Sequence, residues 1–268
     1  MNQNASSIII VKNLVKKFRD FKAVDDISFE VKEGEIFAFL GPNGAGKSTT
    51  IKMLTTLLKP TSGRLVLNGN NPVDNKKETR KSFGIVFQDT SIDDNLTAYE
   101  NMYFHAVLFK VPKDIRKKMI LELLKFVELD ERKGDLVKTF SGGMKRRLEI
   151  ARGLLHNPKI LFLDEPTLGL DPQTRNYIWN FIREINRNEG MTVFFTTHYM
   201  DEAERIADRI AIIDHGKIIA SGTAKELETQ TKTNSLEEAF LTLTGRTIRE
   251  DEASSIDRLR MMRKMRRR

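Results

Sequence analysis

Cysteine is absent from the 268-residue sequence, which therefore offers no disulfide framework, thiolate zinc site, iron–sulfur cluster or cysteine nucleophile. Long apolar stretches are absent as well. Apolar runs such as residues 8–11 and 160–163 have the length of a β-strand and fall far short of the ~20 residues that span a bilayer. Residues 1–7 also lack the basic and then apolar pattern of a secretory signal. We therefore expect neither a transmembrane segment nor a leader peptide.

The formal net charge is +8, but most of this charge lies at one end of the chain. Residues 258–268 contain seven lysine and arginine side chains and no acid, which leaves +1 for the rest. A nearly neutral body argues against a nucleic-acid-binding face on the folded domain. Runs of like charge usually stay extended and solvated, so we expect a flexible tail. The alternatives are contact with an anionic membrane surface, and nucleic-acid binding, which the lack of aromatic residues in the tail disfavours.

Short apolar runs alternate with helical patterns along most of the chain, and 40% of the residues are hydrophobic, as in ordinary globular domains. Candidate strands are residues 8–11, 23–31, 35–40, 64–67, 83–87, 159–163, 192–196, 209–213 and 217–220. The early strands follow one another without helices, which predicts an antiparallel subsheet. Several later strands are apolar throughout and alternate with helices, which predicts parallel strands buried on both faces.

Residues 89–157 interrupt this alternation with helical spacing and no convincing strand. The helical patterns there are residues 97–109, 113–127 and 142–155. We therefore predict an α/β domain with a mixed sheet, an N-terminal antiparallel subsheet and an inserted helical subdomain. The predicted boundaries are 6–230 for the main domain, 89–157 for the inserted subdomain, 231–246 for a C-terminal helical extension and 247–268 for a charged, flexible tail.

A glycine-rich loop follows the apolar run 36–40 and opens a helical pattern. Its residues are Gly41, Pro42, Asn43, Gly44, Ala45, Gly46, Lys47, Ser48 and Thr49. This is the GxxxxGK[ST] pattern in its strand–loop–helix context, the mark of a P-loop NTPase. Glycines let backbone N–H groups converge on a phosphate, and the helix N-terminus adds positive potential. Lys47 is predicted to reach the β- and γ-phosphates and Ser48 to supply a hydroxyl to Mg²⁺.

Two acidic residues, Asp164 and Glu165, end the apolar run 160–163. An aspartate at such a strand end can hold the Mg²⁺ that bridges the phosphates. The glutamate beside it can orient or deprotonate an attacking water. By itself an Asp-Glu strand end is usually a solvated edge, and it is the phosphate loop upstream that favours the catalytic interpretation.

A second possible anion site is the sequence Ser141-Gly142-Gly143, which precedes a helical pattern. Taken alone it is an ordinary helix N-cap. A single nucleotide needs one phosphate cradle, so a second cradle in the same chain suggests a nucleotide shared across a dimer.

Several motifs, in their order along the chain, resemble the nucleotide-binding domain of ATP-binding-cassette (ABC) ATPases over about residues 6–230. The loop 41–49 is similar to Walker A, residues 141–145 to the signature motif and 161–165 to Walker B. The resemblance adds four residues with their family roles. They are Gln88 of the Q-loop, a catalytic residue and Mg²⁺ ligand; Asp171 of the D-loop, beside the nucleotide; His198, the switch histidine that senses the γ-phosphate; and Phe18, which stacks on adenine.

The signature motif departs from the commonest form, because Phe140 and Met144 replace leucine and glutamine. The serine and glycines that touch phosphate in the family are kept. Together with residues 167–173 and 236–246, this variant resembles the drug-resistance (daunorubicin-type) subfamily. Members of that subfamily are separate ATPase subunits of type-2 exporters.

The resemblance implies an ATPase that uses ATP and Mg²⁺ to power a separate transmembrane permease, an exporter of drug, lipid or similar cargo. Two copies are expected to close head to tail, with each ATP between the phosphate loop of one copy and Ser141 and Gly143 of the other. The expected location is cytoplasmic, peripheral on the inner face of the cell membrane.

The alternative is a soluble ABC ATPase that acts on nucleic acid or ribosomes. Translation-linked relatives usually carry two cassettes in one chain, and DNA-repair relatives insert a long coiled coil between Walker A and the signature motif. Here there is one cassette, and 93 residues separate Lys47 from Ser141. Only the basic tail favours the alternative.

Overall fold

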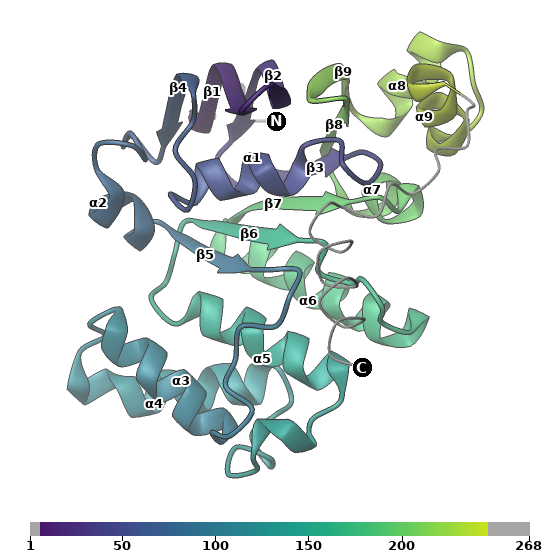
Figure 1. Ribbon diagram of the computed structural model, residues 1–268. Coiled ribbons are helices and arrows are strands. Elements are labelled where there is room, and N and C mark those ends of the chain that lie inside the picture. Colours follow the sequence, from purple (N-terminus) through teal and green to yellow (C-terminus); the bar gives the residue numbers. More distant parts are fainter. Residues whose placement is uncertain (1–5, 246–268) are drawn as a thin grey trace, which may run out of the picture.

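The computed structural model describes residues 6–245, so the predicted tail contacts of residues 258–268 lie outside the described part of the chain. A six-stranded sheet forms the centre of the molecule (Figure 1) in the order β5-β6-β7-β3-β8-β9. Its strands are β3 (Ile36–Leu40), β5 (Phe83–Val86), β6 (Ile160–Asp164), β7 (Thr192–Thr197), β8 (Arg209–Asp214) and β9 (Lys217–Gly222). All neighbouring pairs are parallel except β8 and β9, which form an antiparallel hairpin around Asp214-His215-Gly216.

The central strands are apolar on both sides because each side packs against a different layer. Side chains alternate across a strand. Accordingly, Phe37 and Phe39 of β3 enter one core, and Ile36, Ala38 and Leu40 enter the other. The absence of a solvated face explains the uninterrupted apolar runs of the sequence.

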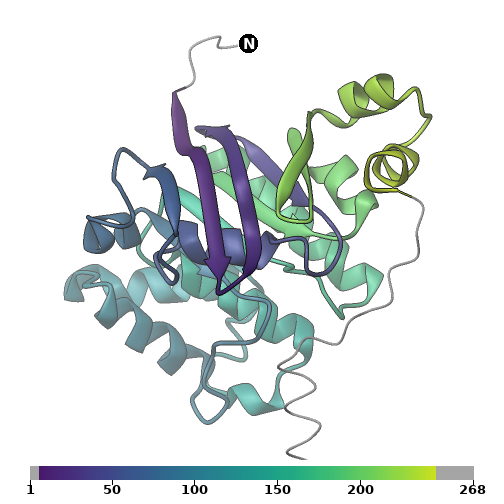
Figure 2. The same ribbon diagram turned by 45° about the horizontal axis from the view of Figure 1, so that its top comes forward.

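An antiparallel sheet and one helix cover the first face. The sheet has the order β2-β1-β4, with β1 (Ser7–Phe18), β2 (Phe21–Lys32) and β4 (Ser62–Leu67). Figure 2 shows β1 and β2 as a long hairpin in front of α1 (Lys47–Leu54). Aromatic rings fill this core, where Phe29 stacks on Phe37 with ring centres 5.7 Å apart. The short helix α2 (Lys76–Lys81) leads from β4 to β5.

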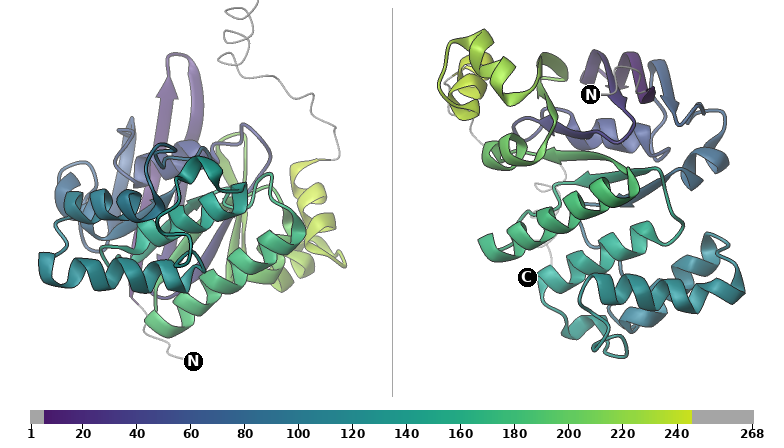
Figure 3. Two further views of the ribbon diagram at one scale, coloured as in Figure 1. Left: turned by 90° about the horizontal axis from the view of Figure 1, so that it is seen from below. Right: turned by 180° about the vertical axis from the view of Figure 1, so that it is seen from behind.

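Helices cover the second face, as the view from below in Figure 3 shows. They are α3 (Ala98–Leu108), α4 (Lys113–Phe126), the 3₁₀ turn η1 (Val137–Thr139), α5 (Gly142–Leu154) and α6 (Pro172–Glu189). Between β5 and β6 the described chain contains only helices, turns and loops. At the junction Gly84 of β5 meets α5 so closely that a methyl group on it would lie 2.3 Å from the carbonyl oxygen of Gly153.

The described part of the chain ends with α8 (Ala224–Thr231) and α9 (Leu236–Thr244), which follow β9, and α7 (Met200–Ile206) connects β7 to β8. This pair lies at the corner opposite α3 and α4 (Figure 1). In residues 6–245 no helix combines the length and the apolarity that crossing a membrane demands.

The predicted fold class is confirmed, with one difference in the early strands. Residues 36–40 do not join the antiparallel subsheet; β3 lies in the middle of the central sheet, parallel to β7 and β8. Its five residues are all buried, whereas β4 exposes residues at its start. A strand without a polar face must lie between two layers, and the outer sheet offers only one.

Candidate functional site

The polar residues predicted to carry chemistry lie at the carboxyl ends of adjacent parallel strands. The glycine-rich loop follows β3, Asp164 ends β6, and His198 follows β7. Because these strands are parallel neighbours in the order β6-β7-β3, their carboxyl ends meet at one edge of the sheet. This edge is where open α/β sheets bind ligands.

Glycine is required in the loop by close backbone approaches. A methyl group on Gly41 would lie 2.4 Å from the carbonyl oxygen of Ile213, and one on Gly46 would lie 2.5 Å from that of Ala23. Gly46 also has a φ of +107°, in the region that favours glycine. The loop therefore turns tightly into α1, with the helix N-terminus at its end.

Lys47 folds back over this loop. Its Nζ donates to the carbonyl oxygens of Gly41 at 2.8 Å and Pro42 at 3.2 Å, and the residue is only 5% exposed. The same Nζ lies 3.1 Å from Oε1 of Glu165. A buried positive charge thus stands at the mouth of a glycine-rich loop, a position suited to an anionic ligand.

Asp164 is held by two hydroxyl donors. Oγ1 of Thr196 donates to its Oδ1 at 2.6 Å, and Oγ of Ser48 donates to the same oxygen at 3.1 Å. Burial raises the pKa of Asp164, and these two hydrogen bonds oppose the shift. The other carboxylate oxygen and the Ser48 hydroxyl are hard oxygen donors of the kind that Mg²⁺ prefers.

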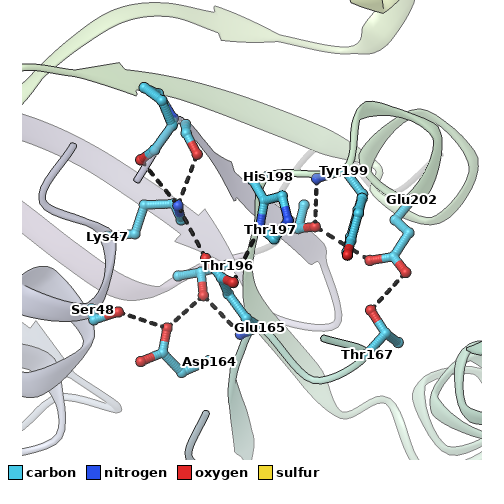
Figure 4. A network of polar contacts seen from close by, with 12 residues as sticks. Lys47, Ser48, Asp164, Glu165, Thr167, Thr196, Thr197, His198, Tyr199 and Glu202 are labelled. Carbon is cyan, nitrogen blue, oxygen red and sulfur yellow. Dashed lines mark hydrogen bonds and ion pairs between the residues drawn. The ribbon is translucent and has the colours of Figure 1, made fainter. Parts of the chain in front are cut away.

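Glu165 adopts a left-handed backbone with a φ of +47°, which costs a non-glycine residue about 1–3 kcal/mol. Its N–H holds this conformation by donating to O and Oγ1 of Thr196, at 3.2 and 3.0 Å. Its carboxylate lies between two nitrogens, Nζ of Lys47 and Nδ1 of His198, each 3.1 Å away (Figure 4).

The surroundings keep the carboxylate of Glu165 ionised. Burial alone would raise its pKa, but the hydrogen bond with His198 and the positive charge of Lys47 outweigh burial, and the pKa lies below its ordinary value. An ionised carboxylate next to a phosphate loop is positioned to accept a proton from water. We call Lys47, Ser48, Asp164, Glu165, Thr196 and His198 the strand-end cluster.

Ser141, Gly142 and Gly143 lie apart from the strand-end cluster, at the start of α5. Oγ of Ser141 accepts from N–H of Met144 at 3.3 Å, so the serine is the N-cap of this helix. Ser141 and Gly142 are exposed. Within residues 6–245 no hydrogen bond joins this segment to the phosphate loop.

Asp171 is likewise an exposed N-cap, that of α6. Its carboxylate accepts from N–H and Oγ1 of Thr174 at 2.9 and 2.6 Å, and these two hydrogen bonds lower its pKa. Among the described residues no hydrogen bond or ion pair joins it to the strand-end cluster.

Gln88 and Phe18 also remain outside the cluster. Gln88 is exposed just after β5, and in the described structure its side chain forms no hydrogen bond. Phe18 ends β1 beside the hairpin turn with 47% of its surface exposed, and Nζ of Lys16 lies 5.0 Å from its ring centre. An exposed aromatic face of this kind is available for stacking.

The loop that contains Gln88 is tied to α5 through its backbone. The guanidinium of Arg146 donates to the carbonyl oxygens of Phe87 and Gln88, the latter at 3.0 Å. Glu149 pairs with Arg146 at 3.1 Å and accepts from N–H of Ser91 at 2.7 Å. The helix that begins at Ser141 therefore also positions the segment that carries Gln88.

Sequence reasoning missed two residues of this region, Thr196 and Glu202. Thr196 lies opposite Asp164 in the parallel register of β6 and β7, which a single sequence does not specify. Glu202 is a buried acid in α7, hydrogen-bonded to Thr167 and Thr197. A glutamate within a charged helical segment carries no signal that marks it as buried.

Three comparisons with known proteins agree with this geometry. Residues 24–168 match the family model described as ABC transporter. The chain is 44% identical over 216 residues to the linearmycin resistance ATP-binding protein LnrL of Bacillus subtilis, covering 81% of this chain and 69% of that protein. It is 41% identical to the daunorubicin/doxorubicin resistance ATP-binding protein DrrA of Streptomyces peucetius, covering 88% and 71%.

Solved structures share the fold. The ATP-binding subunit of an ABC transporter superposes with a TM-score of 0.81 at 29% identity, covering 88% of this chain and 99% of that one. The cassette MJ0796, solved as a dimer bound to ADP and Pi, gives a TM-score of 0.73 at 30% identity, covering 80% and 98%.

Proposed function

The chain belongs to the ABC transporter family as an ATP-hydrolysing subunit that powers a membrane transporter, and from this premise we propose which residues do the work and what the transporter moves. The observation that carries the proposal is the strand-end cluster. The carboxyl ends of three strands place the ammonium group of Lys47, the two carboxylates of Asp164 and Glu165 and the imidazole of His198 beside the phosphate loop.

The phosphate loop and Lys47 bind the triphosphate of ATP in this proposal. Backbone N–H groups of residues 41–49 surround the phosphates at the N-terminus of α1. Lys47 is free to exchange its ion pair with Glu165 for a phosphate oxygen, because both partners are anions. Phe18, exposed at its hairpin, stacks on the adenine ring.

Mg²⁺ fits the oxygen donors next to the loop. Ser48 and Asp164 already share a hydrogen bond of 3.1 Å, so a hydroxyl and a carboxylate converge there, and Gln88 supplies an amide oxygen from the strand beside β6. When bound, the ion neutralises charge on the phosphates. This donor set suits Mg²⁺, because the ion favours oxygen ligands and usually keeps several waters.

Glu165 acts as the general base and His198 as the γ-phosphate sensor. The pKa of Glu165 lies below its ordinary value, so the carboxylate is ionised near neutral pH, the form that can accept a proton from water. Its release from Lys47 on nucleotide binding frees one carboxylate oxygen for the attacking water. His198 remains beside the other oxygen.

A second copy completes the site. Ser141, Gly142, Gly143 and Asp171 lie on exposed helix starts away from their own phosphate loop, which suits contact with the nucleotide of a partner copy. Family members form dimers, and we propose a head-to-tail dimer with two shared ATP sites.

A separate permease docks near the Q-loop in this proposal. The outer side of α3 exposes Tyr103, Phe104, Val107 and Leu108, with Leu108 74% exposed. An apolar patch on a helix beside a polar rim is typical of a protein interface. The patch belongs to the layer that Arg146 and Glu149 tie to Gln88, so movement of this layer on ATP binding would reach the permease.

The proposed cargo is a drug, lipid or similar molecule carried outward, since several relatives are drug-resistance proteins. The relative in Ralstonia nicotianae is a Nod factor export protein, so the class of cargo varies among similar chains. The proposed location is the inner face of the cell membrane, where ATP is available to the permease-bound subunit.

Two measurements test the proposal. Ser48→Ala should raise the Mg²⁺ concentration needed for half-maximal ATPase activity, while Ser62→Ala on β4 should leave it unchanged. Equal Mg²⁺ dependence of Ser48→Ala and the wild type would contradict the proposed metal ligand.

The tagged chain should also co-purify from detergent-solubilised membranes with a multi-helix permease. Leu108→Glu should weaken this capture without lowering the ATPase activity of the free subunit. Recovery of RNA or DNA instead of a membrane protein would favour an ATPase acting on nucleic acid.

A further inference from the structure

Glu202 is a buried acid that the roles proposed so far leave unused. It lies in the first turn of α7 and is only 1% exposed. In the described structure its carboxylate forms no ion pair and is bound instead by two threonine hydroxyls. Burying a carboxylate away from cations is unfavourable, so its hydrogen-bond partners have to replace the lost hydration.

The two hydroxyls come from the two segments that carry the proposed catalytic pair. Oγ1 of Thr167 donates to Oε1 of Glu202 at 2.6 Å, and Oγ1 of Thr197 donates to Oε2 at 3.3 Å (Figure 4). Thr167 follows Glu165 by two residues, and Thr197 directly precedes His198. Both threonines are 1% exposed, so water does not compete for these bonds.

These contacts close a ring around the site. Thr167, two residues after Glu165, donates a hydrogen bond to Glu202. Thr197, the residue before His198, donates a second hydrogen bond to Glu202. The ring closes where Nδ1 of His198 lies 3.1 Å from Oε2 of Glu165. N–H of Tyr199 donates to Oγ1 of Thr197 at 2.9 Å, so the proton of this hydroxyl is directed towards the carboxylate.

We infer that Glu202 is a positioning residue that fixes the distance between Glu165 and His198 through Thr167 and Thr197. This inference rests on the proposed roles of Glu165 and His198. In the described structure no hydrogen bond or ion pair joins Glu202 to either of them or to the phosphate loop, so we expect it to act on the geometry of hydrolysis and to leave nucleotide binding unchanged. The buried carboxylate suits this role because it accepts from two hydroxyls at once.

The experiment compares steady-state ATPase kinetics of the full chain with Glu202→Ala, Glu202→Gln and Glu204→Ala. Loss of two hydrogen bonds to a buried charged group should lower kcat of Glu202→Ala roughly ten- to hundredfold. KM for ATP should change less than about threefold, because interactions confined to the transition state act on kcat.

Glu202→Gln should regain most of kcat, since an amide can accept from one threonine and donate to the other. Glu204→Ala changes an exposed acid of the same helix and is the control.

A double-mutant cycle with His198→Ala separates positioning from general loss of structure. If Glu202 acts through His198, the double variant should be no slower than His198→Ala by more than about twofold. Independent, multiplying losses would overturn the inference, as would a wild-type kcat for Glu202→Ala. Should Glu202→Ala fail to fold, Thr197→Val removes one bond of the ring and is tested in the same cycle.

The same data distinguish the two levels of failure. If His198→Ala hydrolyses ATP at the wild-type rate, the proposed role of His198 is wrong and the inference falls with it. If His198→Ala is slow and Glu202→Ala adds its full separate loss, the role of His198 stands and only the positioning role of Glu202 is overturned.

Discussion

The strand-end cluster and the start of α5 are proposed to bind the same nucleotide from opposite sides, yet they are built in opposite ways. In the cluster, Lys47 and Glu165 are 5% and 7% exposed, and each side chain contacts residues far away in the sequence. At the start of α5, Ser141 is exposed, and among residues 6–245 its side chain is hydrogen-bonded to its own helix.

This difference is consistent with the proposed dimer. Side chains of the cluster are held by partners within the same chain, whereas the first N–H groups of a helix have no partner along the helix and can bind an anion. The cluster is thus organised within one chain, whereas Ser141 and Gly143 are proposed to contact the nucleotide of a second copy.

The largest expected effect comes from removing the base in the cluster. Glu165→Gln keeps the shape of the side chain but loses the proton acceptor, so turnover should fall roughly 10²–10⁴-fold while ATP still binds. Gel filtration with ATP should show a trapped dimer. Glu184→Gln on the exposed side of α6 is the matched control. Near-normal turnover of Glu165→Gln would exclude this residue as the base.

Mixing two inactive variants tests whether the start of α5 serves another copy. Lys47→Ala damages the phosphate loop, and Ser141→Arg blocks the opposite side. In a shared-site dimer, the mixed species places both defects in one site and leaves the other intact. Part of the ATPase activity should therefore return on mixing. Confirmed heterodimers without any recovery would count against sharing by two independent sites.

The junction between the sheet and α5 should be sensitive to one added methyl group. At Gly84 this group would lie 2.3 Å from the carbonyl oxygen of Gly153, so Gly84→Ala should lower the free energy of unfolding by about 1–3 kcal/mol. Gly134→Ala adds a methyl group where no atom lies within 4 Å and is the control. Urea unfolding compares the two, and equal stabilities would show that α5 shifts freely against the sheet.

The helical layer should also have its own response to acid. Burial and the positive charges of Arg152 and His156 lower the pKa of His105 to about 3, from an ordinary value of 6.5. The folded chain then keeps His105 neutral, while the unfolded chain takes up a proton below pH 6.5. Stability is therefore lost as the pH falls from about 6.5 towards 3, by about 1–2 kcal/mol between pH 7 and 5.

Replacing His105 should reduce this loss. Urea unfolding of His105→Leu at pH 7 and pH 5 should show a smaller difference than the wild type. His215→Asn, at an exposed turn where the side chain is 81% exposed, is the control and should keep the wild-type difference. An unchanged difference in His105→Leu would mean that this histidine is protonated in the folded chain.

Sequence alone predicted the strands of the central sheet, the main helices of the inserted layer and the residues of the candidate site. The loop 41–49 was recognisable because the backbone contacts of Gly41 and Gly46 tolerate no side chain, so the local pattern is constrained at each position. Asp164 and Glu165 were visible because they end a strand whose apolar residues face two cores. Such features depend on neighbours in the chain, and a single sequence records them.

Tertiary structure decided which of these residues meet. The central position of β3 and the register that sets Thr196 opposite Asp164 arise from pairing between strands far apart in the sequence. The packing of α7 against these strand ends likewise places Glu202 between Thr167 and Thr197. Local patterns fix where strands and loops begin, because propensity and burial act over a few residues. Contacts between distant segments depend on how whole layers pack, and only the folded chain determines them.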